Sequence, residues 1–367
     1  MYIKKIKIIV SSLWALPIIF LIRIIRPLVK IRFGRIIASR IGHYGSHPQI
    51  SFVREKLDKT KDFFWISGKP CNEFLTKLIS RNLKISPWIR YLDFWNKFVP
   101  LSRYHTNLSP DTDIFDFKLR LLKCPKRFEF FESESILAKK WLKSKGWLEN
   151  QKIICVLVRD SAYLNENASV DAKFNYHSYR NGNIKDFEKA MIWMAEKNSF
   201  VLRMGKKQEM PLETKHKNIY DYAFSKDKSD FLDVWLFANC DLCVSNGTGL
   251  DSLSNVNNNP LICVNHLPIE AYYTYNVVMS YKSLLWEKNS KELNIEEYIK
   301  YQYIDKTNEY KKAGIKIVDQ SSSDILENVK DGWSIHMENQ VLTKAENDQQ
   351  KYYWNLFFKY NKNIMNI

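Results

Sequence analysis

This sequence lacks an apolar run of the length typical of a bilayer-spanning helix, and its first 54 residues lack any acidic side chain. The charge-free stretch near the N-terminus, residues 8–22, contains Pro17 and is shorter than the roughly 20 apolar residues that a spanning helix needs. No small-residue cleavage site follows it, which argues against a secretory signal.

The missing acids leave the N-terminus strongly basic. Residues 1–54 hold ten Lys or Arg and so carry +10 of the formal net charge of +16. The basic residues flank residues 8–22 on both sides, as in segments that lie in a membrane interface and hold anionic headgroups. We therefore expect residues 1–32 to be a membrane-associated segment. The alternative is a buried N-terminal helix of a soluble protein, which the lack of neutralising acids disfavours.

Cysteine usage argues against metal and disulfide frameworks. Cys155 and Cys263 stand in apolar, strand-like runs and are expected to be reduced core residues. Cys240 and Cys243 form a Cys-x-x-Cys, but no second pair follows at zinc spacing. Nucleic-acid binding is also disfavoured, because the excess charge adjoins an apolar segment and no reading motif is present.

The length of 367 residues allows two domains, and only 11 Gly and 11 Pro argue against a long disordered linker. Strands and helices alternate regularly after residue 150. The predicted strands are 153–158, 200–202, 242–244, 260–264 and 315–318, and the predicted helices are 184–197, 230–239 and a tail helix within 338–360.

Polar residues follow four consecutive strands of this second half, in the segments 159–160, 203–206, 245–250 and 265–266. In a parallel α/β sheet with right-handed crossovers these strand ends meet at one edge, where such folds bind ligands. A binding site at this edge is therefore expected.

The first half shows a similar pattern. The β-branched run 36–39 leads into Arg-Ile-Gly-His-Tyr-Gly at 40–45, which predicts a strand, a glycine-rich turn and a cleft-facing His43. A strand at 61–67 and a helix at 72–81 should follow, and another helix at 133–148. Residues 84–130 are aromatic-rich and give no clear assignment. Glu149 and Asn150 mark a break after the helix at 133–148, so we place the domain boundary near residue 150.

Several of these motifs together carry a family resemblance. Arg-Ile-Gly-His at 40–43, Val-Arg-Asp-Ser-x-Tyr at 158–163, Tyr-Arg-Asn at 179–181, Leu-Arg-Met-Gly at 202–205 and Ser-Asn-Gly-Thr-Gly-Leu at 245–250 resemble a bacterial glycosyltransferase family defined largely by sequence. The likeness runs from about residue 25 to about 335. More distantly, the layout is similar to GT-B glycosyltransferases.

This resemblance implies an α/β fold with two Rossmann-like lobes of GT-B type facing across a cleft. The expected parts are a membrane-associated segment at 1–32, an acceptor lobe at 33–150, a nucleotide-sugar-binding lobe at 151–335, and a C-terminal helix at 336–367 that returns towards the first lobe. The implied activity is metal-independent and needs no cofactor.

The chemistry of such a transfer suggests residue roles. Cations and backbone amides must stabilise the departing nucleotide phosphate. Arg159 could equally form a salt bridge, the Ser245 loop could be a plain connection, and the 180–181 pair could cap a helix. The expected donor-binding residues are Arg159, Asp160, Arg180, Asn181, Arg203, Gly205, Lys206, Ser245, Gly247, Thr248, Gly249 and Asn265.

An inverting transfer also needs a base for the acceptor hydroxyl, and His43, with Arg40 beside it, is the candidate. Its turn looks similar to that of heptose-type transferases, where an acid takes a comparable place. The rivals for the role are His47, His105, His177 and His266, and a retaining mechanism or an acid such as Asp113 is the further alternative.

We therefore expect a glycosyltransferase that moves a sugar from a nucleotide-sugar donor to an envelope glycan or lipid-linked acceptor. It should act at the cytoplasmic face of the bacterial inner membrane, held peripherally, monotopically or by a single anchor on the anionic surface. The alternatives are an epimerase-like nucleotide-sugar enzyme on the same fold and a non-catalytic membrane-bound sugar-binding scaffold.

Overall fold

The computed structural model describes residues 11–107, 119–125, 127–162, 174–269 and 276–361. The chain forms two compact units, which are described separately below. Unit 1 comprises residues 1–135 and 256–258, and unit 2 comprises residues 136–255 and 259–367. The units divide at Ser135–Ile136, within a helix, whereas the sequence placed the lobe boundary near residue 150.

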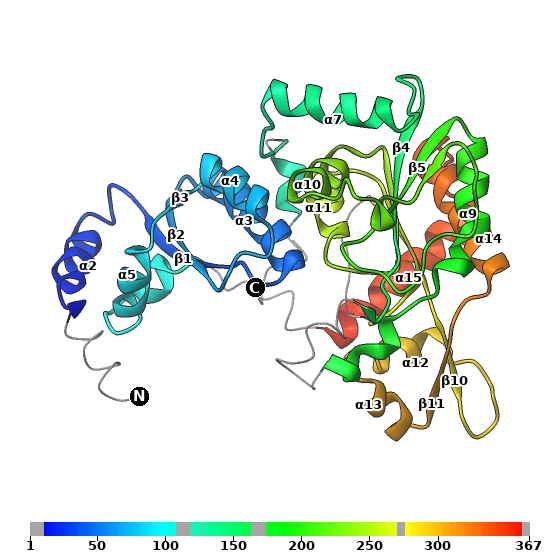
Figure 1. The fold of residues 1–367 in the computed structure, drawn as a ribbon. Coiled ribbons are helices and arrows are strands. Elements are labelled where there is room, and N and C mark those ends of the chain that lie inside the picture. Colours follow the sequence, from blue (N-terminus) through cyan, green and yellow to red (C-terminus); the bar gives the residue numbers. More distant parts are fainter. Residues whose placement is uncertain (1–10, 108–118, 126, 163–173, 270–275, 362–367) are drawn as a thin grey trace. The chain divides into compact units, whose positions relative to one another are not determined.

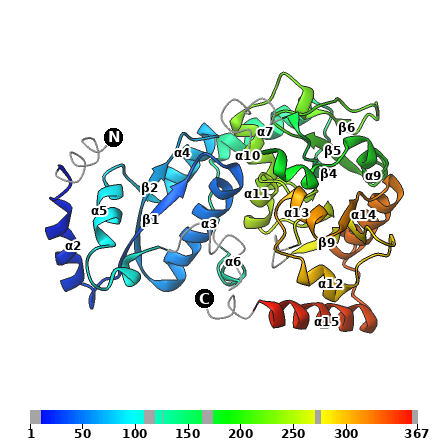
Figure 2. The same cartoon turned by 90° about the horizontal axis from the view of Figure 1, so that it is seen from below.

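Unit 1 is built on a parallel sheet of three strands in the order β1-β2-β3. Helices α3 and α4 cover one face of this sheet, and α5 with α2 outside it covers the other (Figures 1 and 2). The elements are α2 (Ala15–Ile24), β1 (Ile31–Ile37), α3 (Ile41–Asp58), β2 (Lys61–Ser67), α4 (Glu73–Asn82), β3 (Lys84–Ile85), α5 (Ile89–Asn96), a 3₁₀ helix (Ser102–His105) and α6 (Arg120–Lys123).

A buried ion pair joins β1 and β2, in addition to the backbone hydrogen bonds between the two strands. The guanidinium of Arg32 on β1 donates two hydrogen bonds of 2.8 Å to the carboxylate of Asp62 on β2. Asn107 donates a third, of 2.7 Å, to the same carboxylate. Since a bidentate pair of this kind fixes geometry as well as charge, it locks the register of the sheet.

Helix α2 has one face in the core of unit 1. Ala15, Ile19 and Ile22 are buried and pack in one cluster with Phe33 of β1 and Ile89 of α5. Helix α2 is therefore a layer of unit 1, whereas the sequence predicted a membrane-associated segment at 1–32 separate from the first lobe. No helix in the described residues is long and apolar enough to cross a membrane. Residues 8–10 lie outside the described residues.

The segment 40–45 is not a turn. Arg40 is the N-cap of α3, in an extended conformation, and Gly42, His43 and Gly45 lie in its opening turns. The strand ends at Ile37, and Ala38 and Ser39 form the connection. Two glycines and a histidine mimic a turn signal, but Tyr44 is fully buried and its hydroxyl donates to Thr76 Oγ1 at 2.8 Å, so tertiary packing holds the segment as a helix.

Unit 2 contains a parallel sheet of six strands in the order β6-β5-β4-β7-β8-β9. Helices α9 and α14 cover one face, with α10 and α11 on the other (Figures 1 and 2). The strands are β4 (Lys152–Leu157), β5 (Ser199–Met204), β6 (Ile219–Tyr220), β7 (Leu242–Ser245), β8 (Leu261–His266) and β9 (Val277–Tyr281). This architecture confirms the predicted α/β class with parallel sheets.

The core of unit 2 lies between this sheet and helices α9 and α14. Ile154, Val244 and Ile262 of the sheet are fully buried against Phe187 of α9 and Val329 of α14. Strands that are apolar along their whole length are typical of a sheet covered on both faces. Cys155 and Cys263 are buried in these strands as free thiols, as predicted.

The remaining elements of unit 2 surround the sheet. A separate antiparallel ribbon pairs Ser283 with Val318 and Trp286 with Ile315. The terminal helix α15 packs on α12 within the same unit. The elements are α7 (Glu132–Ser144), a 3₁₀ helix (Phe174–Arg180), α9 (Ile184–Glu196), a 3₁₀ helix (Tyr222–Phe224), α10 (Asp230–Asn239), α11 (Asp251–Val256), β10 (Ser283–Trp286), α12 (Ile295–Lys300), α13 (Thr307–Lys312), β11 (Ile315–Val318), α14 (Ser322–Met337) and α15 (Lys344–Tyr360).

Candidate functional site

The carboxyl edge of the six-stranded sheet gathers most of the predicted donor residues. Strands β4, β5, β7 and β8 run parallel, so the segments that follow them emerge at one edge, as the sequence pattern predicted. Arg159 and Asp160 follow β4, the glycine loop 245–250 follows β7, and Asn265 and His266 end β8.

Asn246 connects three segments at this edge. Its fully buried side chain accepts a hydrogen bond from the Arg159 amide at 2.9 Å and donates one to the Arg180 carbonyl at 3.0 Å. The amide of Gly182 also donates to the Arg159 carbonyl, at 2.8 Å. The end of β4, the glycine loop and residues 180–182 therefore form one hydrogen-bonded assembly. Asn246 is not among the donor-binding residues that the sequence predicted.

Arg180 and Asn181 belong to this assembly. A guanidinium nitrogen of Arg180 donates to the Gly247 carbonyl at 2.7 Å, and the backbone carbonyl of Asn181 accepts from the Lys282 ammonium at 2.6 Å. Two buried polar atoms here, Arg180 Nε and Asn181 Oδ1, have no hydrogen-bond partner among the described residues. Since buried polar atoms are normally paired, these two mark a place where a polar ligand could bond.

Positive charge accumulates around His177. Burial and, to a smaller extent, the neighbouring guanidiniums of Arg180 and Arg159 together lower the pKa of this imidazole from 6.5 to about 4. The imidazole Nδ1 lies 3.1 Å from the backbone carbonyl of Asp305. Two arginines close enough to suppress protonation of a shared neighbour create a local potential that favours an anion.

The glycine loop is largely satisfied by its own residues. The Gly247 amide donates to Ser245 Oγ at 3.0 Å, and the Thr248 amide donates to the buried carboxylate of Asp251 at 2.8 Å. Ser245 Oγ donates to the same carboxylate at 2.7 Å, and the Gly249 carbonyl accepts from Ser252. These two amides and the Ser245 hydroxyl therefore have partners within the loop, and the predicted contacts of Ser245, Gly247 and Thr248 with a donor stay predictions.

Position 247 requires glycine, because the His266 ring lies too close to leave room for a side chain. Its φ is +85°, and a Cβ at this position would lie 2.1 Å from Nδ1 of His266. His266 is fully buried, with Nδ1 3.4 Å from the Asn246 carbonyl. The loop thus holds its shape through contact with the end of β8.

Asn265 is occupied by the segment that enters α14. Its side-chain oxygen accepts from the Gln320 amide at 2.9 Å, and its own amide donates to the Gln320 side chain at 3.0 Å. Lys282 lies nearby, buried, and forms an ion pair of 2.5 Å with Asp319. Burial lowers the pKa of Lys282, and the Asp319 carboxylate opposes this effect. A third cation thus approaches residues 180–182 from the connection between β9 and β10. The sequence did not indicate Lys282, because it is remote along the chain.

Arg203 is paired within the fold. Its side chain is fully buried and donates to Asp221 at 3.1 Å and to Gln208 at 3.0 Å. The guanidinium therefore has partners within the fold, and its predicted contact with a phosphate stays a prediction. Gly205, at φ +145°, packs against Gln208, and Lys206 is half exposed with its ammonium 3.9 Å from Asp230.

Asp160 is held at the start of its loop. Its carboxylate accepts from the amides of Ala162 at 3.0 Å and Glu209 at 2.8 Å. Burial raises the pKa of this carboxyl, while the two amides lower it. Asp160 thus links the segment that follows β4 to the segment that follows β5.

In unit 1, His43 lies in the first turn of α3 beyond the carboxyl end of β1, with Arg40 exposed ahead of it. The imidazole of His43 is half buried, and its ring packs edge-on against that of His47 at 5.9 Å. Among the rival histidines, His47, His105 and His266 are buried, and His105 bonds the Ile31 carbonyl at 2.7 Å. Asp113 and Tyr163, the last residue of the motif at 158–163, lie outside the described residues.

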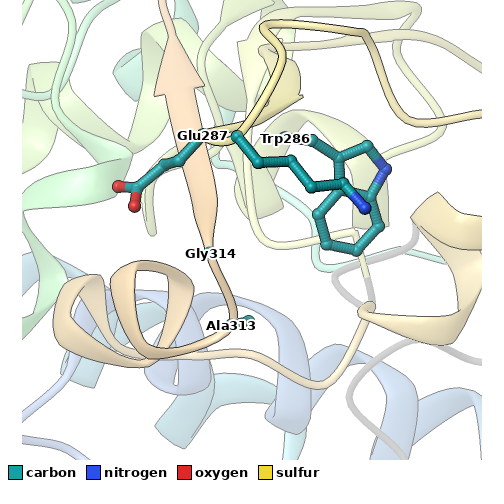
Figure 3. A pocket seen from close by; sticks show the side chains of 5 residues that line it. Trp286, Glu287, Ala313 and Gly314 are labelled. Carbon is teal, nitrogen blue, oxygen red and sulfur yellow. The ribbon is translucent and has the colours of Figure 1, made fainter.

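A shallow hollow of about 480 Å³ lies elsewhere on unit 2, at the far end of the β10–β11 ribbon from Lys282 (Figure 3). The indole of Trp286 forms its wall, with the Lys288 ammonium 5.7 Å from the ring. Glu287, Ala313 and Gly314 complete the lining. The hollow shares no residue with the sheet-edge assembly.

No protein-family model and no curated protein matches this chain. Among solved structures, it is similar to ADP-heptose lipopolysaccharide heptosyltransferase II of E. coli, with a TM-score of 0.45, 11% identity and coverage of 82% of this chain and 98% of that one. A family 9 glycosyltransferase of Veillonella parvula DSM 2008 gives a TM-score of 0.45, 9% identity and coverage of 83% and 97%. The dodecameric iron-containing heptosyltransferase TibC, in complex with ADP-D-beta-D-heptose, gives a TM-score of 0.40 and 10% identity, with coverage of 85% of this chain and 76% of that one.

Proposed function

We propose that this protein is a glycosyltransferase and that the carboxyl edge of its six-stranded sheet binds the diphosphate of a nucleotide sugar. The observation that carries the proposal is the pair of guanidiniums, Arg159 and Arg180, which flank the neutral imidazole of His177 beside unpaired buried polar atoms. Guanidinium groups match phosphate oxygens in charge and geometry.

The same edge supports specificity for a nucleotide sugar over a simple anion. Asn181 Oδ1 is a hydrogen-bond acceptor, which a phosphate cannot satisfy but a sugar hydroxyl can. Arg180 Nε is a donor, which suits a phosphate oxygen. A donor group and an acceptor group on adjacent residues therefore fit a ligand that carries both phosphate and hydroxyl groups.

The proposed reaction transfers the sugar to a hydroxyl of an envelope glycan or lipid-linked acceptor. The C1–O bond to the nucleotide diphosphate breaks, the acceptor oxygen bonds to C1, and the acceptor proton passes to a base. The diphosphate leaves with its negative charge, which Arg159 and Arg180 would stabilise. We propose His43 of unit 1 as the base, in a GT-B arrangement of two Rossmann-like lobes about a cleft, with no metal or cofactor.

Calorimetric titration of UDP, GDP, ADP and CMP, each with a sugar conjugate, tests donor binding. At least one diphosphate should bind, and Arg180→Ala should weaken it while Arg23→Ala, a cation of unit 1, should not. Hydrolysis of the bound conjugate without acceptor, followed by transfer when an acceptor is added, separates a transferase from an epimerase, which would return an isomeric donor. Failure of every nucleotide to bind would refute the proposal and favour a non-catalytic scaffold.

A further inference from the structure

Helix α2 is apolar on the face that does not pack on the core. Its ten residues contain one charged side chain, Arg23. While Ala15, Ile19 and Ile22 are buried, Leu21 and Ile24 are exposed, Ile24 by 74%. A surface helix of a water-soluble protein normally carries polar residues on its outer face. The apolar outer face of α2 therefore indicates contact with a second apolar environment besides the core.

Helix α5 and the turn after it extend the apolar surface. Trp88 is 64% exposed and Phe98 is 67% exposed, and Leu101 and Tyr104 are exposed as well. These residues come from a part of the chain more than 60 positions away from α2. Large exposed aromatic side chains that gather in this way mark an interaction site.

Contacts along α2 make the two groups continuous. At its start, the Trp14 ring packs edge-on against Trp88, with 6.2 Å between centroids. Near its end, Arg23 donates to the Pro100 carbonyl at 2.8 Å, and the Arg26 guanidinium lies 4.1 Å from the Tyr104 ring centroid. We call the combined surface the α2/α5 face; its exposed apolar members are Leu13, Trp14, Ile18, Phe20, Leu21, Ile24, Leu28, Trp88, Phe94, Phe98, Leu101 and Tyr104.

The charge around this face is of one sign. Lys30, Arg90, Lys97 and Arg103 are exposed within or beside it. The only acid in residues 11–54 and 84–107 is Asp93, and it is buried and accepts a 2.9 Å hydrogen bond from Trp65 Nε1. An apolar centre with Trp and Tyr, surrounded by Lys and Arg, matches the acyl and anionic headgroup layers of a bilayer.

We propose that the α2/α5 face is a preformed membrane-binding surface that seats unit 1 on an anionic lipid bilayer. Helix α2 is about 15 Å long, half the thickness of the hydrocarbon core, so it enters one leaflet only. The inference concerns residues separate from the proposed donor site. A second copy of the chain is a poorer occupant, because two copies of this basic surface would repel each other.

Substitution of exposed residues is the appropriate test, because deletion of α2 would also uncover the core around Phe33 and Ile89. The double variant Leu21→Glu/Ile24→Glu and the variant Trp88→Glu place carboxylates on the face. Val341→Glu in unit 2 is the matched control, because Val341 is an apolar side chain that is 84% exposed outside this face. Thermal unfolding of all three confirms that the fold is kept.

Flotation with phosphatidylcholine vesicles containing phosphatidylglycerol measures the partitioning. The unaltered protein and Val341→Glu should float, and the two face variants should stay in the soluble fraction. Removal of one basic charge, as in Lys97→Gln, should weaken partitioning roughly fivefold, and phosphatidylcholine alone should bind less. Nucleotide affinity should be the same in every variant, so this result does not depend on the donor site.

Three results would overturn the proposal. The first is no flotation of the unaltered protein. The second is equal flotation of the face variants and the unaltered protein. The third is a dimer in analytical ultracentrifugation that Leu21→Glu/Ile24→Glu dissociates, together with no vesicle binding, which would assign the face to a second copy.

Discussion

The Arg180 guanidinium donates to the Gly247 carbonyl at 2.7 Å, so a cation of the 3₁₀ helix is anchored on the glycine loop. Its Nε atom has no partner in the described part of the chain and is the group offered to a ligand. Because a charge-assisted hydrogen bond contributes about 1.5 to 3 kcal/mol, Arg180→Ala should weaken nucleoside diphosphate binding by roughly 10- to 150-fold. Calorimetric titration measures this, with Arg180→Lys as the charge-preserving control. Unchanged affinity in Arg180→Ala would show that the residue only anchors the loop.

Arg203 should act on stability. Arg203→Met removes the buried partner of Asp221 and should cost about 2 to 4 kcal/mol of unfolding free energy, since a partly buried carboxylate loses its charged partner. Urea denaturation measures the loss, and the double variant Arg203→Met/Asp221→Asn should recover part of it. A stable Arg203→Met protein with weakened nucleotide affinity would restore the phosphate-binding assignment.

Two glycines separate backbone strain from steric overlap. Gly247 and Gly146 both have positive φ, at +85° and +100°, so Ala at either costs about 1 to 2 kcal/mol in backbone strain. Only at Gly247 would the new Cβ meet another group, His266 at 2.1 Å, whereas nothing lies within 4 Å at Gly146. Gly247→Ala should therefore lose about 1 to 3 kcal/mol more than Gly146→Ala in thermal unfolding. Equal losses would mean that His266 moves aside freely.

The titration of His177 should report on the bound anion. With a folded pKa of about 4 against 6.5 for the free group, His177 stays neutral in the native state while the unfolded chain takes up a proton as the pH falls. Its contribution to stability is therefore complete above pH 6.5 and decreases between pH 6.5 and 4. A nucleoside diphosphate should raise the pKa, because its negative charge favours the imidazolium.

Nuclear magnetic resonance of the imidazole protons measures the pKa of His177 with and without nucleotide, and His177→Asn assigns the signal. The sheet-edge site would be excluded if saturating nucleotide left the titration unmoved.

His43→Ala should lower transfer turnover by roughly 10²- to 10⁴-fold with donor affinity nearly unchanged, because base catalysis acts on the acceptor proton. The acidic limb of the pH–rate profile should disappear with it. His47→Ala, which changes the neighbouring ring on the same helix, is the control, and its turnover should be affected less. Near-normal turnover of His43→Ala would direct attention to a retaining mechanism.

Sequence patterns located elements where local signals were strong. The strands Lys61–Ser67 and Ile315–Val318 and the helix Asp230–Asn239 lie where they were predicted, since apolar periodicity and flanking caps agree there. Asn183 and Ser321 cap their helices with side-chain hydrogen bonds. The short strands β6, β9 and β10 were missed, because they take their shape from neighbours remote in sequence.

The site was predictable in place but not in detail. The rule that ligands bind at strand ends located the edge of the sheet. Arg203 was predicted to bind the donor but is paired with Asp221, and Asn246, which was not predicted, holds the strand-end segments together. The buried guanidinium of Arg203 pairs with Asp221, and Asn246 connects three segments. Neither set of partners is local in the sequence. Only three-dimensional contacts distinguish a cation that stabilises the fold from one that can meet a ligand.

In unit 1, α2 and α5 cover the face of the sheet opposite to α3, whose first turn carries His43 (Figure 2). Packed layers stand about 10 Å apart, so His43 is held on the order of 20 Å from the axis of α5. On a bilayer this arrangement would act as a rigid spacer of fixed height. Acceptors would then be sorted by how far their reacting hydroxyl extends from the acyl chains, in addition to the identity of their terminal sugar.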